Sequence, residues 1–502
     1  MTKLIDLPSE VLFEICLNVF LISGSEAWAE YTIDPTTGEH NPAAQNRVDL
    51  VREYCNSRIL TNTFVCNSDA LYSCQGTLMI QVYEGITLVR CPHKNILPLS
   101  LTCKRLHEIV EALLWCFVET DQESKGAIGD LVRILSTILK RPELGRHTKV
   151  LAFRHFYLDD DSSPFSADET KEMKTILEWD TSHQVAALLD HLPNLRAMKL
   201  AIETQPDYFS VFRPSTLYTS GFPLGLQNLT EFSFHWEDPD GESFSAEMLL
   251  PLFLLPNLKT LYLGHIAAEG NREDLHDFTR YYGTSTITTL IIDFAIVEEA
   301  AITAYLKLPK RLERFEYTYD SGSNRVSNAE PEEYLRALLP QKDSLTTLKI
   351  RGCREIQTFD SEEAPDPHII RSFTLLTEYA FPLSLMLFLD PDAPNTHYRL
   401  EEILPPNVQY VAVHAYDDWS FDGVNDLLKS FFSFGKVKFP SLRKMKLEIW
   451  LQEDDYTLHA PKGRKSEAIG VITSRVQSLK QRAKDKGATL RVDLDTLSAQ
   501  AG

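Results

Sequence analysis

Beyond residue 145 the sequence repeats one six-residue pattern with three apolar positions. Two residues separate the first apolar position from the second, and one residue separates the second from the third, so the apolar residues occupy positions one, four and six. The copies begin 25 to 34 residues apart. Because neighbouring side chains of a strand point to opposite faces, the second and third apolar residues of each copy share one face. The pattern predicts nine strands, at Leu195-Met198-Leu200, Leu229-Phe232-Phe234, Leu258-Leu261-Leu263, Ile287-Leu290-Ile292, Leu312-Phe315-Tyr317, Leu345-Leu348-Ile350, Leu376-Tyr379-Phe381, Val408-Val411-Val413 and Leu442-Met445-Leu447.

Helical patterns fill the gaps between these strands, as at residues 182–192, 298–308 and 331–340. Five of the nine strands follow a lead-in that contains proline, a residue that favours turns. Each unit is therefore predicted to run helix, turn, strand, which gives an α/β fold with one parallel sheet. Residues 149–153 and 488–494 are expected to open and to close the series.

The N-terminal segment has a helical rather than an alternating period. Pro8 suits the first turn of a helix, where its missing N–H costs nothing, and apolar residues recur with helical spacing from Val11 to Val19. Periodicity alone indicates an ordinary amphipathic helix. The order of residues is more specific, because Leu7–Ile15 resembles the first helix of the F-box, a motif of three short helices.

The matching second half lies far downstream, at Asn95–Glu119. Its centre, Leu99–Leu106, and its end, Leu114-Trp115, resemble the second and third F-box helices. We therefore predict a split F-box, made of residues 1–20 and 95–119 around an insert at 21–94.

Members of the F-box family bind a Skp-family adaptor, which links them to a cullin–RING ubiquitin ligase. The resemblance implies the same partner for this chain, with some of the matched residues forming the internal core of the F-box instead. The candidates for adaptor contact are Leu7, Pro8, Val11, Leu12, Ile15, Leu97, Leu99, Leu101, Cys103 and Leu106.

The insert carries four cysteines, at Cys55, Cys66, Cys74 and Cys91. Zinc ligands usually come in close pairs such as C-x2-C, and these cysteines form no such pair, so we expect no metal. The segment is predicted to be loop-like. A second interpretation stays open, in which the working protein never contains it, since a loop of this length is unusual inside a small helical motif.

The repeated strand pattern resembles the strand half of a leucine-rich repeat. The copy that begins at Leu345 matches best, and the resemblance makes Cys353 a buried structural thiol. Leucine-rich repeats behind an F-box define the F-box/leucine-rich-repeat family. That family implies a linker helix or repeat cap at 120–148 and a degenerate solenoid at 149–502, with strands on the concave face and helices on the convex face.

The third and fifth positions of each copy are expected on the concave face, where a protein substrate would bind. They include five basic and three acidic residues, and three large groups, Tyr262, Ile291 and Tyr410, that this register should expose. His235-Trp236, His414 and Trp419 are expected in loops after the strands, as aromatic anchors. The candidates for substrate contact are Tyr262, Ile291, Arg314, Lys349, Tyr410, Lys444 and Lys446.

Composition narrows the function classes further. A net charge of −21 argues against nucleic acid and anionic lipid as partners. The sequence contains no run of about 18 apolar residues, so we expect no membrane span. The eight scattered cysteines are expected to be free thiols. No nucleotide-binding, metalloprotease or serine-hydrolase motif occurs, and Asp320-Ser321-Gly322 is interpreted as a polar loop. We expect no catalysis and no cofactor.

The resemblance implies a substrate-recognition subunit of a Skp–cullin–F-box ubiquitin ligase, acting in the cytoplasm or nucleus. The alternative is a scaffold that binds proteins through its repeats and degrades none. The sequence does not identify the substrate.

Overall fold

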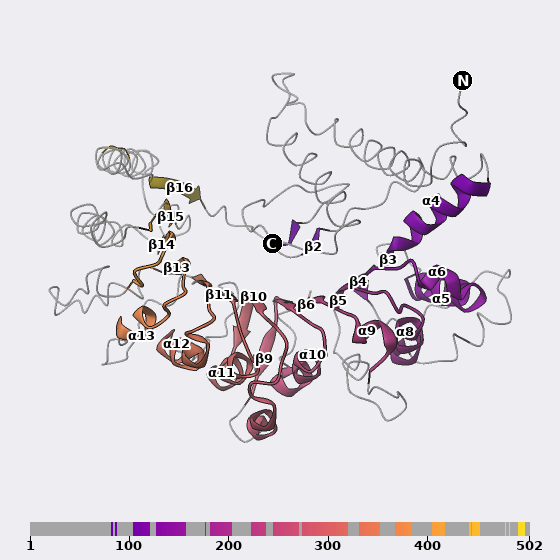
Figure 1. Ribbon diagram of the computed structural model, residues 1–502, viewed down its shortest axis with the longest axis horizontal. Helices are drawn as coiled ribbons and strands as arrows, with labels where there is room; N and C mark the ends of the chain where they lie inside the picture. Colours follow the sequence, from indigo (N-terminus) through magenta and orange to yellow (C-terminus); the bar gives the residue numbers. More distant parts are fainter. Residues whose placement is uncertain are drawn as a thin grey trace, which may run out of the picture. The chain divides into compact units, whose positions relative to one another are not determined.

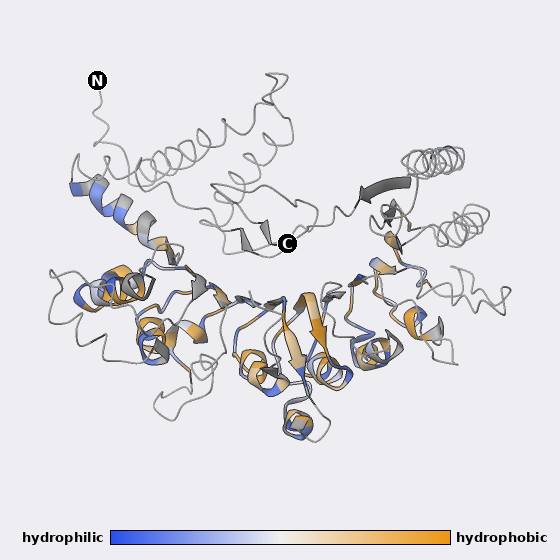
Figure 2. Ribbon diagram, turned by 180° about the vertical axis from the view of Figure 1, so that it is seen from behind, coloured by the Kyte–Doolittle hydropathy of each residue, from blue (hydrophilic) through white to orange (hydrophobic). Residues whose placement is uncertain are grey.

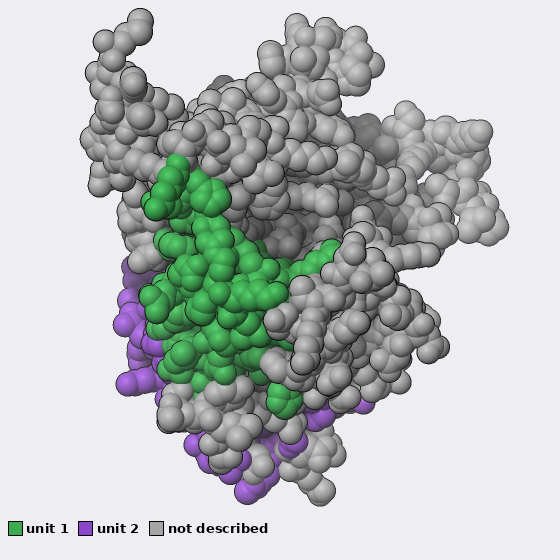
Figure 3. Space-filling view, turned by 90° about the vertical axis from the view of Figure 1, so that its right-hand side faces the viewer, with its two compact units in different colours: residues 1–234 green, residues 235–502 purple. Residues whose placement is uncertain are grey.

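A computed structural model of the chain divides it into two compact units, Met1–Phe234 and His235–Gly502 (Figure 3). The structure describes residues 82–83, 86–87, 104–120, 127–156, 176, 181–202, 222–236, 244–270, 274–319, 331–351, 367–382, 404–416, 441–442, 444–451, 477, 481 and 490–496.

The fold has α/β character, with parallel strands and with helices between successive strands (Figure 1). The strands are β1 (Val82–Tyr83), β2 (Ile86–Thr87), β3 (Phe117–Thr120), β4 (Val150–Phe156), β5 (Ala197–Ile202), β6 (Glu231–Trp236), β7 (Phe244–Ser245), β8 (Thr260–Gly264), β9 (Ala267–Glu269), β10 (Thr289–Val297), β11 (Arg314–Tyr319), β12 (Thr347–Arg351), β13 (Glu378–Pro382), β14 (Tyr410–Tyr416), β15 (Lys444–Leu451) and β16 (Leu490–Thr496).

Most helices are short, which suits units of about thirty residues that must also hold a strand and two turns. The helices are α4 (Lys104–Cys116), α5 (Ala127–Lys140), α6 (Pro142–Gly145), α8 (Thr181–Asp190), α9 (Leu224–Gln227), η3 (Ala246–Leu249), α10 (Leu250–Phe253), η4 (Asp274–Tyr281), α11 (Glu299–Lys307), α12 (Pro331–Leu338), η5 (Leu339–Gln341) and α13 (Pro367–Arg371).

In the first unit the strand order is β3, β4, β5, β6. Strands β3 and β4 are parallel, as are β4 and β5, and Phe117 lies beside Val150. Helix α4 ends at Cys116, and strand β3 follows it directly at Phe117–Thr120. Val118 is buried in this unit, and the branched and aromatic residues of the segment favour a strand once a partner strand is present.

In the second unit the order is β8, β10, β11, β12, β13, β14, β15, β16. Each of these neighbouring pairs is parallel. A smaller parallel group, β7, β9 and the end of β10, forms where β10 shifts register between Ile292 and Ala295. Within this unit the helices lie along one face of the sheet (Figure 1).

The core lies between that face and the helices. In the copies from Leu258 to Val413 the last two apolar positions are buried there, as Leu261 and Leu263 are at 0% exposure. Tyr305 of α11 is also fully buried, stacks on Phe253 at 5.2 Å between ring centroids, and donates from its hydroxyl to Ala246 O. Figure 2 shows hydrophobic residues concentrated on strand β10 and on the helices beside it.

The nine predicted strands are confirmed as β5, β6, β8 and β10–β15, and the predicted flanking strands as β4 and β16. The three predicted helices correspond to α8, α11 and α12. The pattern missed β3, β7 and β9, which have two to four residues each. Strands this short carry too few positions for an alternating pattern to emerge.

The predicted first F-box helix lies outside the described residues, and so does most of the insert, of which β1 and β2 form an antiparallel pair. The four cysteines of the insert, Cys353 and the loop at Asp320-Ser321-Gly322 also lie outside them. The predicted domain boundaries stay predictions.

Candidate functional site

The candidate site is the sheet face opposite the helices in the second unit. Residues at the third and fifth pattern positions stand beside their counterparts on the next strand, so they form two rows across the sheet. The first row is Thr260, Thr289, Arg314, Thr347, Glu378, Tyr410 and Lys444. The second row is Tyr262, Ile291, Glu316, Lys349, Ala380, Ala412 and Lys446.

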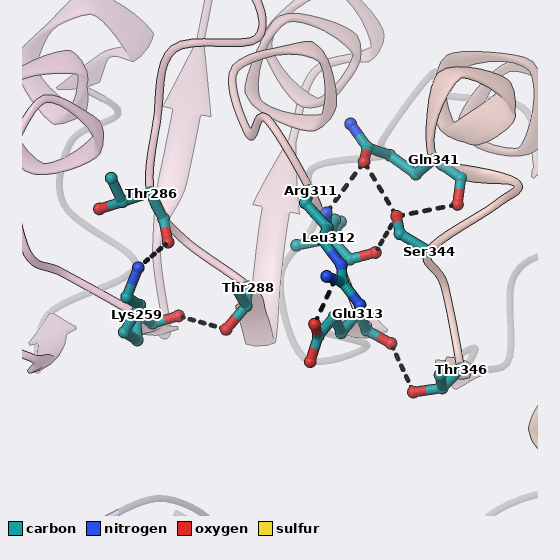
Figure 4. A network of polar contacts seen from close by, with 9 residues as sticks. All are labelled: Lys259, Thr286, Thr288, Arg311, Leu312, Glu313, Gln341, Ser344 and Thr346. Atoms are coloured by element: carbon teal, nitrogen blue, oxygen red, sulfur yellow. Dashed lines mark hydrogen bonds and ion pairs between the residues drawn. The ribbon is translucent and has the colours of Figure 1, made fainter.

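Backbone hydrogen bonds just before each strand hold the rows in register. The carbonyl of Glu313 accepts from both Thr346 N and Thr347 N, at 2.8 and 3.1 Å. The carbonyl of Thr346 does the same for Thr377 N and Glu378 N. Thr346 adds its hydroxyl as a third donor to Glu313 O, at 2.9 Å (Figure 4). The start of each strand is therefore tied to the strand before it, which fixes the height of the row residues.

A buried glutamine braces the same edge (Figure 4). Gln341 is 4% exposed; its Nε2 donates to Pro309 O at 2.9 Å, and its Oε1 accepts from Leu312 N at 2.9 Å. Ser344 donates to Leu312 O at 2.8 Å. These bonds join the turn after η5 to the chain that enters β11, the strand of Arg314 and Glu316.

The two rows differ in exposure. Of the first row, Thr260, Thr289, Arg314, Glu378 and Tyr410 are half-buried. In the second row Tyr262 and Ile291 are only 3% and 2% exposed, so the prediction that the register exposes them is wrong. Tyr262 and Ile291 lie side by side on the adjacent strands β8 and β10. The Tyr262 hydroxyl donates to Asp293 Oδ2 at 3.0 Å. Its polar end is therefore satisfied inside the structure.

A charged cluster occupies the middle of the two rows. Glu316 Oε1 lies 2.5 Å from Arg314 Nη2 and 3.1 Å from Lys349 Nζ. Lys349 Nζ also lies 3.8 Å from Glu378 Oε2. The side chains of Glu316 and Lys349 are 5% and 6% exposed, whereas those of Arg314 and Glu378 are 19% and 44% exposed. The ion pair of Glu316 and Lys349 is thus buried, and two more exposed charges, the cation of Arg314 and the anion of Glu378, lie beside it.

Positive charge controls the ionisation of Glu316. Burial raises its pKa, but the charges of Lys349, Arg314 and Arg351 lower it by more, so the pKa lies below its ordinary value. The carboxylate stays ionised at neutral pH. Arg314 Nε is buried without a hydrogen-bond acceptor in the described structure, so this cluster holds more cationic donor capacity than Glu316 uses.

This arrangement suits the binding of a partner surface. Arg314, Glu378 and Tyr410 offer a cation, an anion and a phenol in one solvent-reachable row. Such a row fits a partner surface with charges of both signs, because complementary charges select partners and fix register. The buried Glu316 beneath it orients Arg314.

The structure places the remaining substrate candidates less fully. Lys444 and Lys446 lie on β15, one in each row, beside Tyr410 and Ala412 of β14. His235 and Trp236, expected in a loop, lie in β6 and are 9% and 3% exposed, so that prediction is wrong. The strand continues two residues past the apolar pattern, because Trp236 extends the buried face.

His414 lies in β14 rather than in a loop, and Trp419 is outside the described residues. Glu316 and Glu378 occupy the predicted face positions but are not among the substrate candidates. The signal was present, since residues of opposite charge occupy the same pattern position in neighbouring copies, as Glu316 and Lys349 do.

Nine of the ten adaptor candidates lie outside the described residues, and Leu106 lies in α4. Within the described ranges, no cluster of three or more His, Cys, Asp or Glu residues is arranged to hold a metal ion. Over those same ranges, no helix has the length and apolar character needed to cross a membrane. No model of a protein family matches the sequence, and no curated protein matches it significantly.

Proposed function

We propose that this protein is the substrate-recognition subunit of a Skp–cullin–F-box ubiquitin ligase. One observation carries the proposal: Leu7–Ile15 and Leu99–Leu106 resemble the two halves of an F-box in residue order as well as in periodicity. An amphipathic helix of ordinary kind needs only the periodicity. The proposed F-box docks a Skp-family adaptor and through it a cullin–RING ligase.

We propose further that the sheet and its helices form a degenerate leucine-rich-repeat solenoid. The support is the regular order of strands β10 to β16, each parallel to the next, with helices between several of them. A solenoid is expected to add one structural unit after another in this way. Its strand face is proposed to bind a protein substrate.

The proposed mechanism is proximity. A substrate held on the two rows, above all at Arg314, Glu378 and Tyr410, would present its lysines to the ubiquitin-conjugating enzyme recruited by the cullin. Tethering of this kind raises the effective concentration of the reacting groups, to the millimolar range for short flexible linkers. The proposed site of action is the cytoplasm or nucleus, and the chain itself contributes no catalytic group.

Co-purification with a Skp-family adaptor tests the proposal. Leu12→Asp and Ile15→Asp are expected to abolish the association, because each buries a charge in an apolar contact. Leu375→Asp is the matched control, since Leu375 is 47% exposed and lies in the second unit. An adaptor that binds the Leu12 and Ile15 variants as well as it binds the wild type refutes the F-box.

A scaffold that binds the adaptor but degrades nothing is the second candidate, because the rows offer a binding face whatever the fate of the partner. Ubiquitination of captured partners separates the two functions. Deletion of residues 21–94 tests a third arrangement, in which the insert blocks adaptor docking. Tighter adaptor binding after deletion supports blocking, and unchanged binding shows that the insert is merely tolerated.

A further inference from the structure

Two residues near the carboxyl end of β8 and within β10 have an unusual backbone. Among the described residues, His265 and Phe294 are the two non-glycine residues with positive φ, at 52° and 47°. Left-handed backbone is unfavourable for any residue that carries a Cβ. Glycine or asparagine would relieve that cost. The chain keeps an imidazole and a phenyl ring at these two positions instead.

The two strained residues lie together. His265 N donates to Asp293 O at 2.8 Å, which sets the chain beside Phe294. The His265 and Phe294 rings are stacked, with centroids 5.3 Å apart, and the His235 ring lies 4.6 Å from that of His265. Three rings from three separate segments thus form a ladder. His265, the middle ring, and Phe294, one of the two outer rings, are the residues with left-handed backbone.

A carboxylate stands beside this ladder. Asp293 Oδ2 accepts from the Tyr262 hydroxyl at 3.0 Å, and Asp293 pairs with Gly264 in the sheet register. A Cβ at Gly264 would lie 2.7 Å from His235 Nδ1 and 2.9 Å from Tyr262 Cε1, so glycine is what allows these groups to approach. The result is one ring–carboxylate cluster, made of His235, Tyr262, His265, Asp293 and Phe294.

The members of the cluster form two layers. Tyr262 and His235 are buried, at 3% and 9% exposure. Asp293, His265 and Phe294 are half-buried and reachable from solvent. The buried layer holds the Asp293 carboxylate in place through the tyrosine hydroxyl. The outer layer thus combines one carboxylate with two stacked aromatic rings, and all three residues are partly exposed.

We propose that the ring–carboxylate cluster binds a cationic side chain of a partner protein, with arginine preferred. A guanidinium stacks on aromatic rings and forms charge-assisted hydrogen bonds with a carboxylate. The net charge of −21 draws basic segments toward the protein and repels nucleic acid and anionic lipid. The cluster is not among metal-holding groups in the described structure. The proposal does not depend on adaptor binding.

The test uses the full chain with isotope-labelled histidine and two small probes. Nα-acetyl-arginine amide carries the guanidinium, and Nα-acetyl-citrulline amide has the same shape without the charge. Imidazole resonances of His235 and His265 are followed by NMR during titration. Saturable shifts with the arginine probe and none with the citrulline probe are expected. Equal shifts with both probes overturn the proposal.

Two carboxylate variants test whether the interaction is specific. Asp293→Asn keeps an acceptor for Tyr262 but removes the charge, and is expected to weaken arginine binding at least fivefold. Asp343→Asn removes an exposed carboxylate elsewhere in the second unit and is expected to leave binding unchanged. If Asp293→Asn has no effect, or if Asp343→Asn weakens binding equally, the interaction is a diffuse charge effect and the cluster is no site.

Phe294→Asn separates binding from folding. Asparagine tolerates left-handed backbone, so this variant is expected to melt no lower than the wild type while binding arginine at least threefold more weakly. Phe294→Tyr keeps the ring and is expected to retain binding. Wild-type affinity in Phe294→Asn would show that the ring serves the backbone turn alone, and would overturn the proposal.

Discussion

Arg141 and Glu111 are joined by two hydrogen bonds, from Nη1 to Oε1 at 2.6 Å and from Nη2 to Oε2 at 2.7 Å. Glu111 lies in α4, and Arg141 directly precedes α6, where its Nε also donates to Glu143 at 2.9 Å. The pair ties the helix of the predicted F-box segment to the helices of the same unit. Bidentate geometry of this kind is stronger than an ordinary surface ion pair.

Removing this pair should loosen α4. Glu111→Gln is expected to cost about 1 kcal/mol locally, because a charge-assisted bidentate contact is lost at a site with a 21% exposed carboxylate. Amide hydrogen exchange across residues 104–116 should then rise about fivefold, as follows from that free energy. Glu108→Gln is the control, since Glu108 is 62% exposed and lies 4.0 Å from Lys104. Equal protection in both variants would contradict the prediction.

The buried ion pair of Glu316 and Lys349 should show strong coupling. Glu316→Leu is expected to lower the free energy of unfolding by about 3 kcal/mol, because Arg314 and Lys349 lose a buried partner. Lys349→Met should cost less, since Glu316 keeps Arg314. The double variant should cost at least about 1 kcal/mol less than the sum of the single variants, as measured by urea unfolding. Additivity within about 0.5 kcal/mol would show that the two charges do not interact.

Acid should remove the stability that Glu316 contributes. Its pKa is lowered in the folded protein, so the contribution is complete above the ordinary glutamate value of about 4.3 and is lost as pH falls through the folded pKa. The melting temperatures of wild type and Glu316→Gln should therefore differ most at pH 7 and converge below about pH 4.

Gln409→Leu serves as the control for this pH series, since residue 409 is exposed and neither side chain titrates. It should keep the acid dependence of the wild type. A constant difference between wild type and Glu316→Gln from pH 7 to pH 3 would mean that the carboxylate is not stabilised in the folded state.

Loss of the Gln341 brace should destabilise the second unit. Gln341→Leu leaves Leu312 N and Pro309 O without their partner, at a cost of about 2 kcal/mol. Gln409→Leu makes the same chemical change at an exposed position and should stay within about 0.5 kcal/mol of the wild type. Thermal unfolding of both variants measures the difference, and equal melting temperatures would contradict the role given to the brace.

The repeat pattern predicted the strands well, because burial of one face imposes an alternating period that survives in the sequence. Leu261 and Leu263 are read directly from it. It did not predict that Trp236 extends β6 or that Phe117 begins a strand, since both depend on a neighbouring chain segment for their hydrogen bonds and cover. Tyr262 was assigned to the correct row but to the wrong environment.

By itself, the sequence determined the helix–turn–strand repeats, their spacing and the two rows of the sheet face, because these follow from local geometry repeated along the chain. Only the tertiary structure decided which row residues are reachable, that Glu316 joins Arg314 and Lys349, and that His265 meets Phe294. The contacts of Glu316 with Lys349 and of His265 with Phe294 join residues 33 and 29 positions apart, which the pairing of neighbouring strands brings together, while Arg314 lies on the same strand as Glu316. Exposure and ion pairing depend on distances between strands, which no periodicity within one strand records.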